Sequence, residues 1–553
     1  MIQLLWVDDE VELLKAHIIF LEKKGYAVTT VSNGTDAIDL CQERSFDLVL
    51  LDEQMPGLSG LETLQRIKQI TPATPVVMVT KSEEENIMEQ AIGQKIADYL
   101  IKPVNPSQIL LVLKKNIHRR EIETEVTQSQ YQQQFQQIAM QIQDCHTWRD
   151  WTEVYRSLVH WELQLAGTDS GPMSEMLAMQ KEEANQGFAK FVKKHYMSSL
   201  PPSPPHKSAS PAAPLKDKRL YASAEAARLK GSHTTTPGRE DGGEALFSPS
   251  LFKEKVFPLL DKKEKVFLVV MDNFRYDQWR LLSQEIGQLF DIDEDLYFSI
   301  LPTATQYARN AIFSGLMPNM IEQMFPDLWV DEDSEEGKNL NEAPLIQTQI
   351  DRFRRHDTFS YHKINTSAEA DRLLQQFKSL DKYDLNVVVF NFIDMLSHAR
   401  TESRMVRELA NNESAYRSIT LSWFRHSVIA DFFRLLAQTH HKVIVTTDHG
   451  SIRCTKPVKI VGDRNTNTNL RYKLGKNLGY DAKDLFVIKT PAEAQLPSPN
   501  ISTSYVFATG NAFFAYPNNY NYYVSYYKDT FQHGGISMEE MIIPLITLTG
   551  KRR

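Results

Sequence analysis

Short apolar runs alternate with amphipathic stretches at the start of the chain. The runs QLLWV, YAVTTV, FDLVLLD, PVVMVT and DYLIKP are strand-like, and helical patterns such as EVELLKAHIIFLEKK separate them. Five strands that alternate with helices predict an α/β domain with a doubly wound parallel sheet and right-handed crossovers. We assign residues 1–120 to this first domain.

The pattern changes three times after this domain. Residues 121–199 contain few Gly or Pro and many Gln, Glu, Leu and Met, which predicts an α-helical bundle that serves as a connector. Residues 200–246 are rich in Pro, Ser, Ala and charge, so we expect a flexible linker with at most a short helix at 222–230. The strand-like runs KVFLVVMD, LNVVVFNFID and KVIVTTD then predict a larger α/β domain over residues 247–553.

Composition fits several folded domains in a reducing compartment. A chain of 553 residues is too long for one core, and its 42% hydrophobic residues are enough to fold. The net charge of −8 argues against a protein that coats nucleic acid. Cys41, Cys145 and Cys454 lie too far apart for a disulfide framework or a thiolate zinc cluster. Without a signal-peptide pattern or a long apolar run, we expect a cytoplasmic protein that does not enter a membrane.

Acidic residues, a threonine and a lysine follow the predicted strands of the first domain. Asp8 and Asp9 end the first strand, Asp52 ends the third, Thr80 ends the fourth, and Lys102 follows the fifth. The carboxyl ends of parallel strands meet at one edge, so we expect these side chains to share one crevice. Clustered carboxylates repel one another unless a divalent cation lies among them, and a site with only oxygen ligands favours Mg²⁺.

Each residue of this expected magnesium site has a predicted role. Asp52 is the phosphate-accepting nucleophile, Asp9 and the carbonyl of Gln54 are direct ligands, and Asp8 binds through water. A single acid at a strand end could merely cap the following helix. Five matched positions on the strand ends favour the phosphate site instead.

The remaining polar positions are expected to respond to phosphate. Lys102 would balance the charge of the incoming phosphoryl group. Thr80 would move to bond the acquired phosphate, and the Tyr99 side chain would then turn inward after Thr80. The motifs VDDE, LLDEQMPGLSG, VMVT and YLIKP resemble the CheY-like receiver domain of two-component systems over about 120 residues. The resemblance implies a flavodoxin-like fold, a sensor histidine kinase as partner and a homodimer after phosphorylation.

Acids recur at strand ends in the larger domain, and histidines accompany them. Asp272 ends FLVVMD, Asp394 ends VVVFNFID, and Asp448 and His449 follow VIVTT. Three strand ends therefore deliver acids to one edge of the predicted sheet.

Two further histidines extend this set. His398 lies four residues after Asp394, so both side chains can face one ion from the same side of a helix. His533 lies in the turn QHGG, where glycine lets a ligand approach the backbone. Mixed Asp and His ligands favour zinc over Mg²⁺, and this set could hold two ions. Each feature alone is more often an ordinary turn or a surface ion pair, but together they favour a metal site.

A nucleophile is available beside these predicted ligands. Two ions suit displacement at phosphorus, because one lowers the pKa of the nucleophile and the other holds a phosphate oxygen. Thr305, in LPTATQYARNA, lies between a predicted strand and a helix N-terminus, where its hydroxyl can approach an ion. Thr303 is the alternative nucleophile. Asn310 and Arg309 are candidate helpers, although Arg309 could equally be a solvated helix residue.

The larger domain resembles the PglZ branch of the alkaline phosphatase superfamily. The motifs that carry the resemblance are VVMDNFRYDQW, LPTATQYARNA, FNFIDMLSHAR, TTDHGS and QHGGISMEEMIIP, within residues 247–549. By position, the resemblance implies one zinc ion held by Asp272, Thr305, Asp448 and His449, and another held by Asp394, His398 and His533. It also implies phosphodiester hydrolysis through a threonine, where alkaline phosphatase itself uses a serine.

The order of receiver, helical bundle and PglZ domain resembles the PorX-type response regulators of type IX secretion. This resemblance implies a sigma factor as a partner and activity toward oligonucleotides. Our leading hypothesis is a zinc-dependent phosphodiesterase in which phosphorylation of Asp52 controls dimerisation and access to Thr305. The alternative is a non-catalytic scaffold that binds a sigma factor or another transcription regulator.

Two other stretches are candidates for substrate contact. The segment KPVKIVGDRNTNTNLRYKLGKN could hold an anion or simply be solvated, and its basic residues include Lys459, Arg464, Arg471 and Lys473. The segment AYPNNYNYYVSYY could stack bases, but an edge strand is the favoured interpretation. A helix-turn-helix pattern is not apparent, which disfavours direct DNA binding.

Overall fold

The computed structural model describes residues 2–81, 96–167, 171–202, 245–331, 339–410, 412–462, 466–481 and 485–551. The chain forms two compact units, which divide after Gln132 within helix α5 (Pro106–Gln143). The short helix expected at 222–230 lies outside the described residues. Among the helices that the structure describes, none has both the length and the hydropathy that a membrane span requires.

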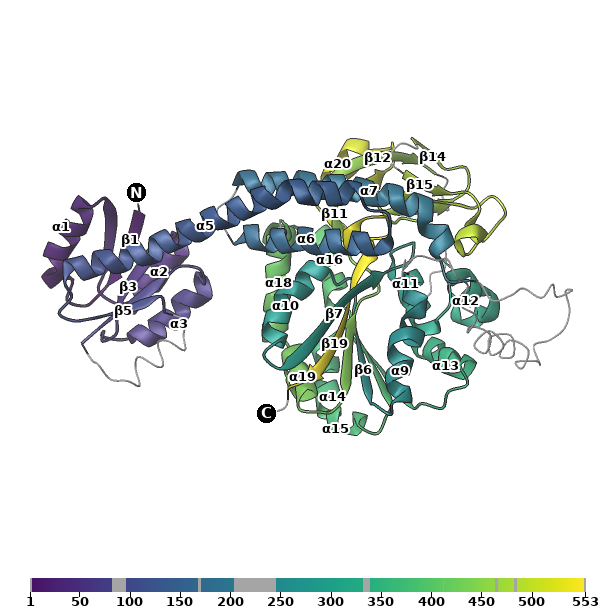
Figure 1. Ribbon diagram of the computed structural model, residues 1–553, viewed down its shortest axis with the longest axis horizontal. Coiled ribbons are helices and arrows are strands. Elements are labelled where there is room, and N and C mark those ends of the chain that lie inside the picture. The colour runs from purple at the N-terminus through teal and green to yellow at the C-terminus, as the bar shows by residue number, and fades with distance from the viewer. Residues whose placement is uncertain are drawn as a thin grey trace, which may run out of the picture. The chain divides into compact units, whose positions relative to one another are not determined.

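The first unit is built on a five-stranded parallel sheet with the order β2-β1-β3-β4-β5 (Figure 1). Its strands are β1 (Ile2–Val7), β2 (Tyr26–Val31), β3 (Leu48–Asp52), β4 (Val76–Thr80) and β5 (Asp98–Ile101). The helices described with them are α1 (Lys15–Lys23), α2 (Gly34–Glu43), α3 (Gly60–Ile70) and the start of α5. The five predicted strands and the doubly wound, flavodoxin-like order are confirmed.

Alternating side chains of these strands build two cores, one on each face of the sheet. Leu5 and Val7 belong to the core that includes Leu64 of α3, whereas Leu4 and Trp6 belong to the core that includes α5 residues. A strand buried on both faces needs apolar residues at every position, and for this reason the β1 run shows no polar alternation. Both cores leave the carboxyl ends of the strands open for polar residues.

Helices α6 (Trp148–Ala166) and α7 (Gly171–Ser199) continue the predicted helical connector after α5. A capping box formed by Thr147 and Asp150 starts α6. The ring of Trp148 packs edge-on against Phe247 and Phe298, with centroid distances of 5.1 and 4.7 Å. Helices α6 and α7 therefore share a core with the larger domain and belong to the second unit.

A six-stranded mixed sheet forms the centre of the larger domain, with the order β7-β19-β10-β6-β9-β8. These strands are β6 (Val266–Met271), β7 (Phe290–Phe298), β8 (Phe359–Ile364), β9 (Leu385–Phe390), β10 (Lys442–Thr446) and β19 (Ile542–Gly550). Neighbours β10, β6, β9 and β8 are parallel, and β19 runs antiparallel to β10 and β7. The predicted strands FLVVM, NVVVF and VIVT thus become adjacent, and their carboxyl ends lie at one edge.

Helices surround this sheet, as Figure 1 shows. They are α9 (Phe257–Asp261), α10 (Tyr276–Ile286), α11 (Thr305–Ser314), α12 (Pro318–Met324), α13 (Glu342–Arg352), α14 (Ser367–Gln375), α15 (Phe377–Leu380), α16 (Phe392–Glu402), α17 (Arg404–Leu409), α18 (Glu413–His426), α19 (Val428–Ala437) and α21 (Met538–Met541). Three small sheets add β11 (Ile452–Arg453), β12 (Lys456–Val461), β13 (Tyr472–Gly475), β14 (Gly479–Tyr480), β15 (Leu485–Ile488), β16 (Ser504–Ala508), β17 (Ala512–Ala515) and β18 (Phe531–Gln532).

The tyrosine-rich segment is a helix, so the expected edge strand is wrong. Helix α20 (Tyr520–Tyr527) stacks the ring of Tyr522 on Tyr526 and that of Tyr523 on Tyr527, each pair with centroids 6.1 Å apart. A helix brings residues four positions apart next to each other, and such ring contacts favour the helix although tyrosine has a modest helix propensity.

Candidate functional sites

The first site lies at the carboxyl ends of β1, β3 and β5. Asp8, Asp9 and Asp52 each place a carboxylate oxygen within 4.8 Å of the others. Asp8 and Asp52 are buried and Asp9 is exposed. Lys102 Nζ lies 2.7 Å from Asp8 Oδ2 and 2.8 Å from Asp52 Oδ2. The side chains expected to converge here are therefore together.

One ammonium group offsets part of the negative charge in this site. Burial raises the pKa of Asp52, and the hydrogen bond and charge of Lys102 oppose that rise. Burial lowers the pKa of Lys102, but hydrogen bonds to Asp52 and Asp8 outweigh it and the net pKa is raised. Lys102 thus stays protonated among the acids.

Thr80, Gln54 and Tyr99 are the other predicted residues of the first domain. Thr80 is buried at the end of β4, and its carbonyl accepts from Lys102 N at 2.7 Å. The backbone N–H of Gln54 hydrogen-bonds to the Asp52 carboxylate. Tyr99 is 39% exposed on β5, so its ring is open to solvent here and not turned inward.

The second site lies at the carboxyl edge of the larger sheet and contains two groups of ligand atoms. The first group is Asp272 after β6 and Asp448 and His449 after β10, whose ligand atoms lie within 4.8 Å of one another. Thr305, the first residue of α11, places Oγ1 3.1 Å from His449 Nε2 and 3.4 Å from Asp272 Oδ1. The sequence-predicted members of this group are together, and all but Thr305 are fully buried.

The second group consists of Asp394, His398 and His533. Asp394 Oδ2 lies 3.4 Å from His398 Nε2, and Asp394 Oδ1 lies 3.6 Å from His533 Nε2. Asp394 lies in the first turn of α16 and not in a strand, which gives it the predicted helical spacing to His398. The rings of His449 and His533 stack at 4.2 Å, so the two groups are immediate neighbours.

Backbone carbonyls orient two of the histidines. His449 Nδ1 lies 3.1 Å from the carbonyl of Gly450, and His533 Nδ1 lies 3.1 Å from that of Thr303. If each Nδ1–H donates to its carbonyl, each Nε2 is left as an acceptor that faces the carboxylates, as in metal-ligating histidines. In addition, Asn273 Oδ1 is buried beside both groups and has no hydrogen-bond partner among the described residues. These features and the Asp/His donor set fit a metal centre.

Arg309 is the buried counter-charge of the first group, so it is not a solvated helix residue. Arg309 Nε lies 3.0 Å from Asp448 Oδ2, and its guanidinium also pairs with Asp272. Burial raises the pKa of Asp448, but the charge of Arg309 and the other groups around it, including the backbone N–H of Asn273, together outweigh burial and the net pKa is lowered. For Asp272 burial dominates and the pKa is raised. Arg309 Nη1 lies 3.1 Å from Glu342 Oε1, which links it to a third buried acid.

The hydroxyl of Thr303, the alternative nucleophile, forms its hydrogen bonds with the backbone. Its buried Oγ1 donates to the carbonyl of Gly535 at 2.9 Å and accepts from Gly534 N at 3.0 Å. The hydroxyl therefore holds the turn that carries His533, and Thr305 is the hydroxyl that faces the ligand atoms.

The basic segment after the DHG turn is less open than its composition suggests. Arg471 and Lys473 are buried, with Arg471 Nη2 2.6 Å from Glu540 Oε2 and Lys473 Nζ 2.7 Å from the carbonyl of Asn467. Lys459 is exposed on β12, and Arg464 lies outside the described residues.

Sequence reasoning missed residues that support the ligands. Asn273 directly follows Asp272, has a left-handed φ of 60°, and donates from Nδ2 to Asp394 Oδ1 at 3.2 Å. Its position directly after Asp272 is the sequence signal that could have identified Asn273 as a supporting residue. Glu342 forms ion pairs with Arg309 and, at 2.9 Å, with Lys363 Nζ. No local sequence pattern around Glu342 indicates this role.

Three family models match consecutive parts of the chain. The response regulator receiver domain matches residues 4–114, the PorX response regulator linker domain matches 121–200, and the BREX system PglZ alkaline phosphatase-like domain matches 251–548. Together they cover the two sites and the helices between them.

Similar proteins match the receiver part. The transcriptional regulatory protein ResD of Bacillus subtilis is 35% identical over 117 residues, which cover 21% of this chain and 48% of ResD. A CpxR homolog of Haemophilus influenzae is 36% identical over 121 residues, which cover 22% and 52%. The chain thus spans about half the length of these curated relatives. A solved receiver domain from Clostridium thermocellum is 31% identical, with a TM-score of 0.21, and covers 22% of this chain and 98% of that one.

The fold and the two sites define a two-component response regulator with an alkaline-phosphatase-like output domain. The chain belongs to the PglZ family, as a PorX-type fusion of receiver, linker and PglZ domains. Its receiver domain implies a cognate histidine kinase.

Proposed function

We propose that this response regulator is a zinc-dependent phosphodiesterase that acts on nucleotides or oligonucleotides, with Thr305 as nucleophile. The position of Thr305 Oγ1 carries the proposal, because it lies 3.1 Å from His449 Nε2 and 3.4 Å from Asp272 Oδ1 at a helix N-terminus. A hydroxyl held among metal-ligating atoms is the arrangement that activates a weak nucleophile for attack at phosphorus.

The donor sets suit two zinc ions. One ion would bind Asp272, Thr305, Asp448 and His449, and the other would bind Asp394, His398 and His533. When bound, the ions would supply a lowered pKa for the nucleophile and a positive charge for a phosphate oxygen. Receiver-domain chemistry calls for Mg²⁺ instead, with Asp9, Asp52 and the carbonyl of Gln54 as direct ligands and Asp8 bound through water.

The chain's own residues define the proposed course of the reaction. Thr305 Oγ1 gives up its proton and attacks the phosphorus of a diester, and one alcohol leaves with a proton, which gives a phosphothreonine that still carries the other ester group. Water then attacks this phosphorus, so that a phosphate monoester leaves and the threonine hydroxyl returns. The N-terminus of α11 stabilises the anionic phosphate at Thr305, and Arg309 holds Asp272 and Asp448 in place.

Phosphorylation of Asp52 is proposed to control this output through dimerisation. Lys102 would neutralise the phosphoryl group and Thr80 would bond it. Three exposed apolar side chains on β5 and α5 support an association surface, namely Tyr99, Ile101 and Leu111 at 39%, 37% and 69% exposure. A phosphoryl mimic should therefore raise the sedimentation coefficient of the full chain, and an unchanged coefficient would contradict this scheme. Regulation of type IX secretion and a sigma factor partner are part of the same proposal.

The experiment that tests the activity measures hydrolysis of a diester reporter and of short linear and cyclic oligonucleotides. A zinc chelator should abolish turnover, and Thr305→Val should lower it by at least about 10³-fold, the scale at which loss of a nucleophile acts. Thr305→Ser keeps a hydroxyl and should retain activity, which makes it the matched control. Metal binding without turnover of any diester would favour the non-catalytic scaffold instead.

A further inference from the structure

Helix α7 of the connector touches the loop that precedes Thr305. The hydroxyl of the fully buried Tyr196 accepts a hydrogen bond from Leu301 N at 2.7 Å. Leu301 lies four residues before Thr305, between β7 and α11. The main chain that carries the proposed nucleophile is therefore fixed by a side chain from outside the output domain.

The same helix also holds the segment that follows His533. The buried amide of Asn185 donates from Nδ2 to Glu539 Oε2 at 3.0 Å and accepts at Oδ1 from Met538 N at 2.8 Å. Met538 and Glu539 open helix α21, five residues after His533. The amide nitrogen and the amide oxygen of Asn185 thus both bond to this short segment.

Helix α21 is in turn bonded to both histidine turns. The Glu540 side chain accepts from Gly535 N at 2.9 Å, which ties it to the His533 turn. The Glu540 carbonyl accepts from Gly450 N at 3.1 Å, directly after His449. A Cβ at Gly450 would lie 2.1 Å from the carbonyl oxygen of Glu539, so these segments are in close contact. A shift of α21 would therefore move both turns.

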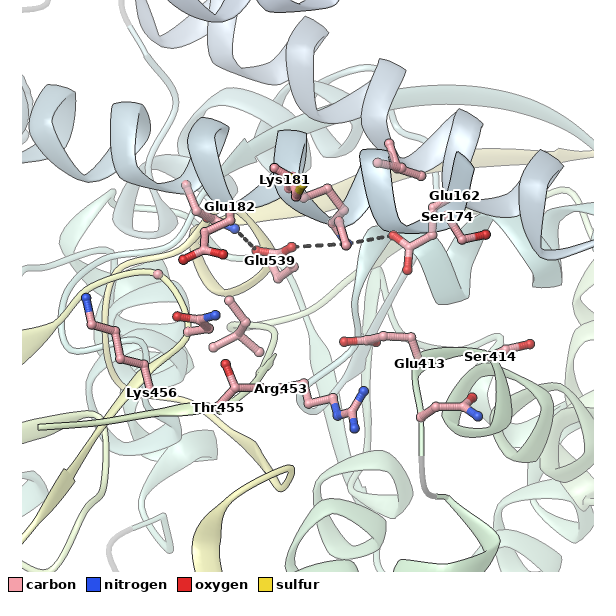
Figure 2. Close-up of a pocket in the computed structure, with 18 of the residues that line it drawn as sticks. Glu162, Ser174, Lys181, Glu182, Glu413, Ser414, Arg453, Thr455, Lys456 and Glu539 are labelled. Carbon is pink, nitrogen blue, oxygen red and sulfur yellow. Dashed lines mark hydrogen bonds and ion pairs between the residues drawn. The ribbon is translucent and has the colours of Figure 1, made fainter. Parts of the chain in front are cut away.

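The attachment of α7 is made of discrete contacts. Figure 2 shows Lys181 of α7 between Glu162 of α6 and Glu539 of the output domain, with Nζ 2.6 Å from Glu162 Oε2 and 3.3 Å from Glu539 Oε1. A cavity of about 740 Å³ lies beside these contacts, between α7 and the strands β11 and β12. Beside this cavity, polar contacts join α7 to the output domain.

We propose that Asn185 and Tyr196 are positioning residues for the reaction, because they fix the loops that carry Thr305, His449 and His533. The connector then sets the geometry of the zinc ligands and of the nucleophile from one rigid helix. This inference rests on the proposed function, since it assigns the residues a role in that reaction.

The test compares two substitutions with matched controls in the full chain. Tyr196→Phe removes the hydroxyl that Leu301 uses, and Asn185→Ala removes both bonds to α21. Tyr155→Phe is the control for the first, because the buried Tyr155 hydroxyl on α6 has no hydrogen-bond partner among the described residues. Gln180→Ala is the control for the second, because the buried Gln180 on α7 donates to the carbonyl of Phe135 within the connector at 3.0 Å.

We expect the two test variants to lower kcat for a diester reporter by about 10- to 100-fold with little change in KM, the scale of a misplaced catalytic group. They should also release zinc to a competing chelator about 10-fold faster, because the His449 and His533 turns are less constrained. Gln180→Ala should shift the urea midpoint by an amount similar to Asn185→Ala, Tyr155→Phe should shift it little, and both controls should leave kcat and zinc release unchanged. A role in stability alone cannot produce this difference.

The outcomes separate this inference from the proposed function. If the wild type hydrolyses the diester and the test variants match their controls in kcat and zinc release, the positioning role is wrong and the phosphodiesterase stands. If the wild type hydrolyses no diester, the proposed function fails. The rate of zinc release then tests on its own whether Asn185 and Tyr196 position the ligands, since this measurement requires no turnover.

Discussion

The receiver site and the output site solve the same electrostatic problem in different ways. Both gather acids at the carboxyl ends of parallel strands, where mutual repulsion must be offset. In the receiver, one ammonium group, Lys102, pairs with both Asp8 and Asp52 and keeps 12% of its side chain exposed. In the output domain, the guanidinium of Arg309 is completely buried against Asp272 and Asp448.

The difference between the lysine and the arginine indicates how each site can function. Lysine carries a compact charge on a flexible stem, so it can change position when the charge around it changes. Arginine presents a planar fork of donors that fixes two carboxylates at once. The receiver is thus built for repeated exchange, and the output site is built to hold fixed ligand geometry. Within the output site the second group is the more open one, since the His398 side chain is 64% exposed.

The largest expected effect distinguishes the buried first group of ligands in the output site from the more exposed second group. His449→Ala should reduce diester hydrolysis by at least about 10³-fold and should strip one zinc ion on dialysis, because it removes a fully buried ligand of the first group. His398→Ala should reduce hydrolysis by only about 10-fold, because water can take the exposed position. Zinc content after dialysis and kcat/KM would be measured for both. Equal losses would contradict the distinction between the groups.

The next effect concerns the buried counter-charge. Arg309→Met should destabilise the zinc-free output domain by about 3–5 kcal/mol, because it leaves buried acids without a partner. Added zinc should restore part of this loss, since the ion would supply the missing charge. Arg309→Lys keeps the charge but loses the fork, so it should cost less. Urea unfolding with and without zinc measures this, and a loss that zinc leaves unchanged would argue against Arg309 acting on the metal group.

The sequence predicted the fold well where strands are buried on both faces. The runs FLVVM, NVVVF and VIVT are almost entirely apolar because helices cover both faces of the sheet, and they became β6, β9 and β10. Polar residues that directly follow such strands must lie at the sheet edge, so Asp272 and Asp448 could be placed without a structure. The helical spacing of Asp394 and His398 was equally local information.

Features that depend on contacts between distant segments could not be predicted. Arg309 looks like a solvated helix residue because its partner Glu342 lies 33 positions away, and no pattern joins the two. Helix α20 was mistaken for a strand because tyrosine favours strands in general, whereas the helix stacks tyrosines that lie four positions apart. The hydrogen bond from Leu301 to Tyr196 spans 105 positions, and only the tertiary fold brings them together.

The smallest expected effect is the receiver counterpart of the arginine substitution. Lys102→Met in magnesium-free buffer should destabilise the receiver by about 1–3 kcal/mol at pH 8, less than Arg309→Met costs, because solvent reaches Lys102 and Asp9. Lys115→Met removes an exposed pair with Asp98 and should change stability little, which makes it the control.

The pH dependence of this variant sharpens the comparison. Burial already raises the pKa of Asp52, and removal of Lys102 should raise it further. A group whose folded pKa exceeds its unfolded value takes up a proton in the native state as the pH falls, so the cost of Lys102→Met should shrink from about pH 8 to about pH 5. Urea unfolding across this range measures the change. A cost that stays constant would mean that Asp52 remains charged without Lys102, and that the receiver site is as firmly fixed as the arginine-bound site of the output domain.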